Sequence, residues 1–159
     1  MQFRKAMPDD AVLIAELVIK LTNEISEVTK AKQFNIDLQE TIDTCRELLV
    51  NGHYQAILAF SDKLNTHQPI AMATLAETYA LYAGGKVGII QEFYTLPEYR
   101  SSGVGSLLME QVKEHGRLSS WACIELCTPP LPEFDRALAF YQRNLFNPVG
   151  GRKMRLSLV

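Results

Sequence analysis

The sequence predicts an α/β (α+β) domain in which helices flank a mixed, mostly antiparallel sheet, with the element order β-α-α-β-β-β-α-β-α-β. Three observations support this fold class. Short runs rich in β-branched and aromatic residues indicate strands. Longer segments repeat apolar residues every three or four positions, which is the period of a helix with one buried face. Clusters of Gly, Pro, Asn and Asp separate these segments and mark the turns.

The first part of the chain predicts one strand and two helices. Residues 3–6 predict a short opening strand. A proline and two aspartates at residues 8–10 then begin a helix, because carboxylates are favourable beside unpaired N–H groups. Its apolar face comprises Ile14, Leu17, Val18, Leu21, Ile25 and Val28. Asp37 begins the second helix with Glu40 three residues later, a capping-box spacing, and Asn-Gly at 51–52 ends it.

The middle of the chain predicts three consecutive strands. Residues 54–60 and 70–78 are strand-like, and the polar segment 61–68 suits a hairpin connection between them. A glycine-rich turn at 81–85 leads into an apolar strand at 87–95. Consecutive strands joined in this way predict an antiparallel arrangement.

The last part of the chain predicts two more helices and two more strands. A helix begins after Gly103, with Val104, Leu107, Leu108 and Val112 on one face, and Gly116 marks its end. Residues 121–127 predict a strand, and the proline-rich segment after it is extended because prolines exclude helix. Residues 133–146 predict a helix. Residues 152–159 alternate apolar and polar side chains, which predicts a final strand.

Composition limits the possible functions. With 159 residues, the chain is expected to form a single domain, residues 1–159, with its own core. Sixteen basic and eighteen acidic residues give a formal net charge of −2, and no basic run predicts nucleic-acid binding. The start of the chain lacks an apolar signal region, and no apolar run reaches membrane-spanning length. These features predict a cytoplasmic protein that contacts neither nucleic acid nor membrane.

The cysteines and histidines predict no disulfide and no metal site. Cys123 and Cys127 lie on one predicted strand, so their Cα atoms are roughly 13 Å apart at about 3.3 Å per residue. That distance is too long for a disulfide or a shared metal ion. Cys45 belongs to an amphipathic helix, so all three are expected to be reduced thiols. The three histidines have no metal-ligand spacing.

The most informative segment is the loop between the strand at 87–95 and the following helix. It contains Arg100-x-x-Gly103-x-Gly105. The first N–H groups of a helix lack intrahelical acceptors, and the helix dipole is positive at that end. Glycines let an anion approach the backbone closely, so this segment predicts an anion site. Its glycine spacing differs from that of a dinucleotide-binding turn and of a P-loop.

This loop resembles motif A of the GNAT acetyltransferases, in which Arg or Gln is followed by Gly and then Gly or Ala at the same spacing. Three further segments match in order. They are an N-terminal Arg-x-Ala at residues 4–6 followed by an aspartate, the junction Leu96-Pro97-Glu98-Tyr99-Arg100, and Ala137-x-x-Phe140-Tyr141, which is similar to motif B. The resemblance covers nearly the whole chain and implies the GNAT fold.

The resemblance implies that acetyl-CoA is the acetyl donor and cosubstrate. The pyrophosphate of coenzyme A is then bound by the backbone amides from Arg100 to Ser106, that is, of Arg100, Ser101, Ser102, Gly103, Val104, Gly105 and Ser106. The pantetheine arm pairs with the end of the preceding strand, at Phe93, Tyr94 and Thr95. The strand at 121–127 diverges from it and leaves space for the thioester. Amides in this space polarise the acetyl carbonyl.

The resemblance also implies the catalytic residues. Tyr141 matches the tyrosine that protonates the coenzyme A thiolate in many members; the alternative is an aromatic side chain packed in the core. The base is Glu92, next to the position usually occupied by glutamate, or Glu125, which matches an Ile-Glu-Leu context used by other members. The alternative for either glutamate is a salt bridge to an arginine. Asn23, Glu24 and Glu27 at the end of the first helix are candidates to contact a cationic acceptor; the alternative for the glutamates is a solvated helix face.

The implied function is N-acetylation of a primary amine by direct transfer in a ternary complex. The acceptor is a small molecule or a protein amine, and a homodimer is an expectation from the family. The motif B match departs from the family pattern at two positions, because Leu145 occupies the place of a glycine and Phe134 that of an asparagine. These departures support an alternative, a catalytically silent acyl-CoA-binding sensor or interaction module.

Overall fold

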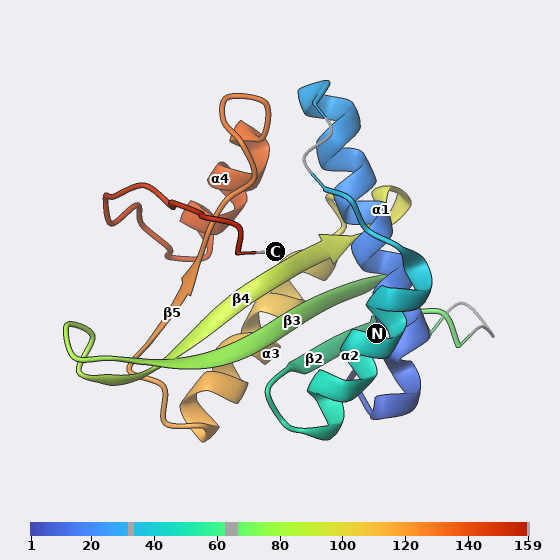
Figure 1. Ribbon diagram of the computed structural model, residues 1–159, viewed down its shortest axis with the longest axis horizontal. Coiled ribbons are helices and arrows are strands. Elements are labelled where there is room, and N and C mark those ends of the chain that lie inside the picture. Colours follow the sequence, from blue (N-terminus) through green and yellow to red (C-terminus); the bar gives the residue numbers. More distant parts are fainter. Residues whose placement is uncertain (32–33, 63–66, 159) are drawn as a thin grey trace. The chain divides into compact units, whose positions relative to one another are not determined.

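The computed structural model describes residues 1–31, 34–62 and 67–158 (Figure 1). The chain divides into two compact units, Met1–Leu126 and Cys127–Val159. The prediction of a single domain over the whole chain stays a prediction. No helix in the described residues is long and apolar enough to cross a membrane.

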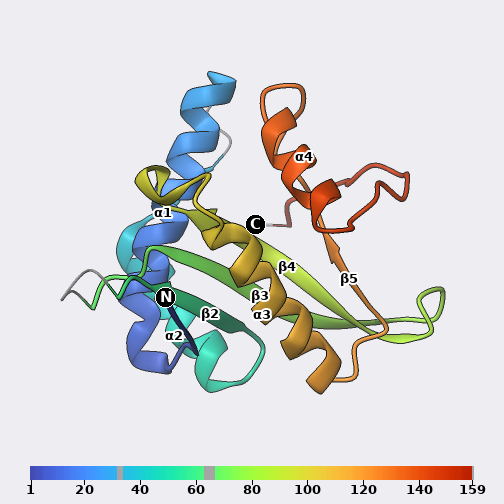
Figure 2. The same ribbon diagram turned by 180° about the vertical axis from the view of Figure 1, so that it is seen from behind.

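The first unit contains a five-stranded sheet with helices on both faces. Figure 1 shows α1 and α2 in front of the sheet, and the reverse view of Figure 2 shows α3 on the other face. The elements in chain order are β1 (Gln2–Lys5), the 3-10 helix η1 (Pro8–Asp10), α1 (Ala11–Thr29), α2 (Leu38–Val50), β2 (Gln55–Phe60), β3 (Ala71–Ala80), β4 (Gly85–Thr95), the 3-10 helix η2 (Pro97–Tyr99), α3 (Val104–Leu118) and β5 (Cys123–Leu126).

The strands lie in the order β1-β2-β3-β4-β5. All neighbours are antiparallel except β4 and β5, which are parallel. A parallel pair requires a long crossover, and α3 supplies it. The predicted mixed, mostly antiparallel α/β fold is therefore confirmed. Part of the predicted hairpin link between β2 and β3, residues 63–66, lies outside the described residues.

Local sequence signals explain where the first two helices begin. The Asp37 side chain accepts a hydrogen bond from the Glu40 amide at 2.9 Å, as the capping spacing predicts. Asp10 accepts one from the Met7 amide at 2.7 Å and two from the Arg4 guanidinium at 2.7 and 2.8 Å. The Arg4 guanidinium lowers the pKa of the Asp10 carboxyl. The aspartate before the first helix thus joins the helix start to β1.

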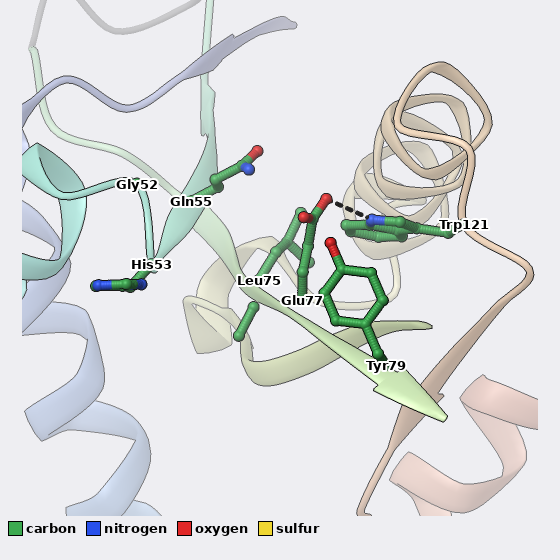
Figure 3. A pocket seen from close by; sticks show the side chains of 8 residues that line it. Gly52, His53, Gln55, Leu75, Glu77, Tyr79 and Trp121 are labelled. Atoms are coloured by element: carbon green, nitrogen blue, oxygen red, sulfur yellow. Dashed lines mark hydrogen bonds between the residues drawn. The ribbon is translucent and has the colours of Figure 1, made fainter. Parts of the chain in front are cut away.

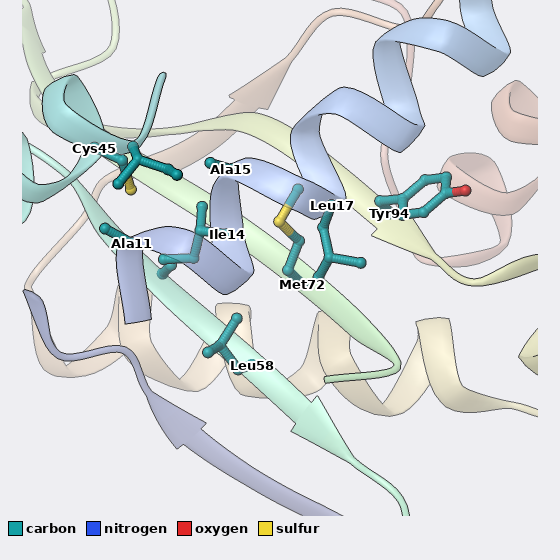
Figure 4. Packing of buried hydrophobic residues seen from close by; sticks show 10 residues of the cluster. Ala11, Ile14, Ala15, Leu17, Cys45, Leu58, Met72 and Tyr94 are labelled. Carbon is teal, nitrogen blue, oxygen red and sulfur yellow. The ribbon is translucent and has the colours of Figure 1, made fainter. Parts of the chain in front are cut away.

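The main hydrophobic cluster lies between the two N-terminal helices and the sheet. Figure 4 shows side chains of α1, α2, β2, β3 and β4 converging there. Its most buried members include Ile14, Leu17, Leu58 and Met72. Full burial of such a side chain stabilises the fold by about 1.5–3 kcal/mol. This packing makes α1 a fixed support for anything attached to its exposed side.

The end predicted for α3 was wrong, because α3 continues past Gly116 to Leu118. A Cβ atom on Gly116 would lie 2.8 Å from the Trp121 ring, and one on Gly88 of β4 would lie 2.0 Å from it. The two glycines therefore form a slot for the indole between α3 and the sheet. Gly116 therefore makes room for the indole. The helix ends at the C-cap Ser119 and the left-handed Ser120, which has a φ of 58°.

The second unit contains α4 (Asp135–Arg143), which is shorter than the predicted helix at 133–146. The predicted final strand at 152–159 is also wrong for its described residues, because 152–158 form no strand. The alternating side chains Met154, Leu156 and Leu158 are 87%, 84% and 88% exposed. Alternation alone does not make a strand, which also needs a hydrogen-bonded neighbour and a face to bury.

His115 of α3 is a buried titratable group on the sheet-facing side of the helix. Its side chain packs edge-to-face on Trp121 at 5.1 Å, and its Nδ1 has no hydrogen-bond partner among the described residues. Burial lowers the pKa of the imidazole, nearby Lys5 lowers it further, and Glu77 acts in the opposite direction. A neutral His115 is therefore part of the folded state.

We expect the free energy of unfolding to fall as the pH is lowered from 7 to 5. In the unfolded chain His115 takes up a proton near its ordinary pKa of about 6.5, whereas the folded protein resists protonation to lower pH. One such group contributes less than about 1.4 kcal/mol per pH unit. Urea unfolding at several pH values measures the slope. His115→Gln should flatten it, and exposed His53→Gln should not; equal slopes in all three proteins would contradict this assignment.

Candidate functional site

The centre of the candidate site is the C-terminal half of β4. Its ladder with β5 runs from Val87–Cys123 to Ile90–Leu126 and ends there, whereas β4 itself continues to Thr95. The register with β3 shifts at the same place, so that Gln91 is an extra residue, a β-bulge. The end of β4 is therefore outside the β4–β5 ladder, at a point where an extended ligand can lie along it.

The backbone of this strand end has two sides. The Leu96 amide donates to the Ile70 carbonyl at 2.9 Å, which directs it toward the β3 side. Because hydrogen bonding alternates along an antiparallel strand, Phe93 and Thr95 direct their backbone groups toward the opposite side. The Thr95 carbonyl accepts a hydrogen bond from Arg100 Nε at 2.9 Å. Of the predicted pantetheine contacts, Thr95 can therefore offer its amide, since its carbonyl is engaged within the protein.

The loop after β4 has an unusual backbone. Ser101 has a φ of 61° and Gly103 a φ of 86°, both left-handed. A Cβ atom on Gly103 would meet nothing within 4 Å, so the space in front of the loop is open. Glycine suits this position because of its left-handed φ, and not because a side chain would clash. The Ser102 hydroxyl donates to the Tyr99 carbonyl at 2.6 Å and closes the turn.

The amides of this loop differ in what they can do. The Arg100 amide donates to the Pro97 carbonyl at 3.2 Å and belongs to the turn. The Leu107 amide donates to the Gly103 carbonyl at 3.0 Å, and the amides of residues 104–106 precede it in the first turn of α3. Amides in such a first turn point outward along the helix axis with the positive end of the dipole. The segment predicted from sequence to bind an anion is thus a helix start with a glycine at its N-cap, and anion binding there stays a prediction.

The Arg100 side chain is held by the protein. Its two terminal nitrogens donate to both Glu24 carboxylate oxygens at 2.8 and 2.7 Å. The guanidinium also lies 5.3 Å from the centre of the Tyr94 ring. Hydrogen bonding to Glu24 raises the pKa of Arg100. Glu24, a candidate for acceptor binding from sequence, is therefore paired with the loop, and its 76-residue separation from Arg100 left no local pattern to predict this.

Glu92 lies immediately after the bulge, and its partners are two hydroxyl groups. Tyr54 donates to its Oε2 at 2.9 Å, and Thr74 of β3 donates to the same oxygen. Among the described residues Glu92 forms no salt bridge to an arginine, which was the expected alternative. Burial and then the Glu92 charge raise the pKa of Tyr54, and they raise that of Cys45 to about 11. Sequence patterns gave no reason to select Tyr54.

Glu125 occupies a different position. It lies on β5 opposite Ile89, inside the paired part of the ladder. Its carboxylate accepts a hydrogen bond at 2.8 Å from Tyr82, which is 81% exposed at the turn between β3 and β4. Glu92 adjoins the end of the ladder, whereas Glu125 faces the exposed hairpin turn.

Comparisons with known proteins show the family of the chain. The model of the acetyltransferase (GNAT) family matches residues 20–145. The chain belongs to the GNAT acetyltransferase family. The aminoglycoside N(6')-acetyltransferase type 1 of Acinetobacter baumannii is 31% identical over 97 residues, which span 59% of this chain and 60% of that protein.

Solved structures share the GNAT fold over nearly the whole chain. An integron cassette protein from the Cole Harbour Salt Marsh metagenome has a TM-score of 0.79 at 18% identity, covering 99% of this chain and 91% of that one. A predicted acetyltransferase of Clostridium acetobutylicum, determined with acetyl-CoA, has a TM-score of 0.77 at 20% identity, covering 99% and 96%. At these identities the similarity concerns the fold.

The segment that resembles motif B from its sequence falls on α4 in the second unit. Tyr141 is 8% exposed, and its ring contacts those of Phe140 at 5.3 Å and Phe146 at 6.0 Å. Burial raises the pKa of Tyr141 to about 12, so the phenol stays protonated over the physiological range. The ring of Tyr141 is thus packed against other aromatic rings, as the core-packing alternative expects. The Tyr141 hydroxyl also retains a proton that it could donate.

The departure at Leu145 has a structural explanation. The Leu145 amide donates to Gln142 and the Phe146 amide to Tyr141, both at 3.0 Å, which is the bond pattern of a Schellman helix end. The residue at the centre of such an end is left-handed, and Leu145 has a φ of 73°. The glycine of motif B is the residue best suited to this conformation. Leucine keeps the same helix end at a conformational cost.

A separate pocket lies on the α3 face of the sheet (Figure 3). Its volume is about 200 Å³, and its lining includes Gln55, Glu77, Tyr79 and Trp121. The Glu77 carboxylate accepts a hydrogen bond from the Trp121 indole at 2.7 Å and lies 3.6 Å from the Lys86 ammonium. None of the residues predicted for catalysis or donor binding lines it. The described residues also contain no group of three or more His, Cys, Asp or Glu arranged to hold a metal ion.

We expect Leu145→Gly to stabilise the second unit by about 0.5–1 kcal/mol. Glycine removes a left-handed strain of roughly 1–2 kcal/mol, offset in part by its greater freedom in the unfolded chain. The side chain is 82% exposed, so little packing is lost. Amide hydrogen exchange at the end of α4 measures the change. Leu145→Ala, which removes the side chain and retains the strain, is the control; slower exchange in Leu145→Ala than in Leu145→Gly would contradict the prediction.

Proposed function

We propose that this GNAT protein is an N-acetyltransferase that moves an acetyl group from acetyl-CoA to a primary amine by direct transfer in a ternary complex. The observation that carries the proposal is the continuous segment from the free end of the β4–β5 ladder through the left-handed loop to the first turn of α3. Acetyl-CoA in the Clostridium acetobutylicum neighbour and the aminoglycoside named for the Acinetobacter relative support the donor and acceptor classes.

The donor contacts follow from the backbone. The amides of residues 101–106 surround the pyrophosphate, and those of residues 104–106 contribute the positive end of α3. The pantetheine arm lies along Phe93, Tyr94 and Thr95 as an added strand beside β4. Binding both substrates in this way places amine and thioester in a near-attack geometry, which supplies roughly 7–11 kcal/mol of the barrier in favourable cases.

The acceptor amine must lose a proton before it attacks. An alkylamine with a pKa of about 10.4 is almost fully protonated at pH 7. Glu92 is the proposed base, acting directly or through water, because it adjoins the ladder end and two hydroxyls fix its carboxylate. Glu125 is the second candidate. The first proton goes from the ammonium to the carboxylate, and the neutral amine then forms the C–N bond. As the C–S bond breaks, the leaving thiolate receives a proton from Tyr141, and the second proton lost from the nitrogen restores the Tyr141 phenol, directly or through water.

We expect Glu92→Gln to lower kcat by about 10²–10⁴-fold, the usual contribution of a general base. The KM for acetyl-CoA should change little, because the amide remains a hydrogen-bond acceptor for Tyr54 and Thr74. The measurement is thiol release from acetyl-CoA at several pH values. Glu125→Gln is the matched variant, with the same charge change on β5. A large loss in Glu125→Gln together with normal activity in Glu92→Gln would assign the base to Glu125 instead.

We expect Tyr141→Phe to lower kcat by at least about tenfold without unfolding the protein, because it removes the proton donor and retains the ring. The assay is thiol release across an amine library that begins with aminoglycosides. Tyr79→Phe, which removes a hydroxyl from a side chain that is 75% exposed, is the control. Wild-type rates in Tyr141→Phe would exclude Tyr141 as the acid.

A second function is favoured by one observation, the leucine at the glycine position of motif B. A catalytically silent acyl-CoA-binding sensor or interaction module would tolerate this change on the catalytic side and keep the donor loop. Calorimetry separates the two functions. Tight coenzyme A binding with no turnover of any amine supports the sensor, turnover supports the enzyme, and the absence of binding contradicts both.

A further inference from the structure

We propose that Glu24 is a positioning residue for donor binding: through its ion pair with Arg100 it holds the loop after β4 in the conformation that binds the pyrophosphate of coenzyme A. The inference rests on the proposed function of this loop. It assigns to α1 a role on the donor side of the site. No sequence motif includes Glu24, and the family pattern accounts only for Arg100.

The contact has the geometry of a specific clamp. Both guanidinium terminal nitrogens reach both oxygens of one carboxylate, at 2.8 and 2.7 Å. The third nitrogen, Nε, binds the Thr95 carbonyl at 2.9 Å. The two side chains are 32% and 29% exposed, so the pair is half-buried. An arginine fixed on three nitrogens has one orientation, and the backbone that carries it is fixed with it.

The two ends of the clamp differ in rigidity. Glu24 projects from a 19-residue helix that is packed into the core by residues such as Ile14 and Leu17. Arg100 stands at the start of a loop that contains left-handed Ser101 and Gly103. Figures 1 and 2 both show the segment after β4 beside α1. The fixed helix therefore determines where the loop starts, and α3 determines where it ends.

The loop needs such an anchor because its conformation is not the one its sequence prefers. A serine in the left-handed region is disfavoured, so an unanchored loop would populate other conformations. The apparent affinity for a ligand falls in proportion to the fraction of protein in the binding conformation. The pair with Glu24 keeps that fraction high. It also neutralises the Arg100 charge, so binding depends on the direction of the amides.

The test is the dissociation constant of coenzyme A, measured by calorimetry on the full chain. We expect Glu24→Gln to weaken binding about tenfold, which corresponds to about 1.4 kcal/mol. The KM for the amine acceptor should stay constant. Glu16→Gln, an exposed residue on the same helix with the same charge change, should bind as the wild type does. Arg100→Gln and the double variant complete a cycle, in which the double variant should bind no more weakly than Arg100→Gln alone.

Each other outcome overturns the inference. An unchanged dissociation constant in Glu24→Gln, even with a lower Tm, would show that the pair serves stability alone. Additive losses in the double variant, or a raised KM for the amine, would show that Glu24 acts apart from Arg100. Should Glu24→Gln fail to fold, Glu24→Asp must still weaken binding measurably. Wild-type protein that does not bind coenzyme A would refute the proposed function itself, a result distinct from binding that is insensitive to Glu24.

Discussion

The site depends on one constraint. The first part of β4 must pair with β5, and the last part of β4 must lie apart from β5. The pairing covers Val87 to Ile90, and the bulge at Gln91 follows at once. A bulge bends the strand and changes which side chains share a face. Glu92 thereby meets Thr74 and Tyr54, and Tyr94 packs against the cluster beneath α1. A regular β4 would lose this arrangement, since a shift of one residue moves each side chain to the other face.

The paired end of the β4–β5 ladder is fixed by packing around Trp121. Its indole occupies the slot formed by Gly88 and Gly116, and its N–H binds Glu77 of β3. This residue sits between the end of α3 and the start of β5, so it fixes both to the sheet. The parallel pair β4–β5 is therefore held at one end by a large aromatic contact. From Trp121 the chain continues into β5, which leaves the ladder after Leu126.

Sequence reasoning succeeded where the deciding interactions are local. The Asp37 cap, the glycine loop and the β3–β4 hairpin all follow from residues within a few positions of one another. It failed where contacts between distant segments decide. Gly116 predicts a helix end from the local pattern, but it forms the slot for the Trp121 indole together with the distant Gly88 of β4. The alternation at 152–158 predicts a strand without supplying a neighbour. The pairs Glu24–Arg100 and Tyr54–Glu92 span 76 and 38 residues, and no period or spacing marks them.

The charges of the donor loop explain why its shape matters more than its sign. The chain has a net charge of −2, and the only arginine in the loop is already paired with a carboxylate. Attraction for an anion must then come from backbone amides and from the helix dipole, which amounts to about half a charge and acts within the first turn. Such a field is short in range and strongly directional. An anchor that orients the amides therefore affects anion binding more than an additional exposed cation would, since exposed charges are screened by salt.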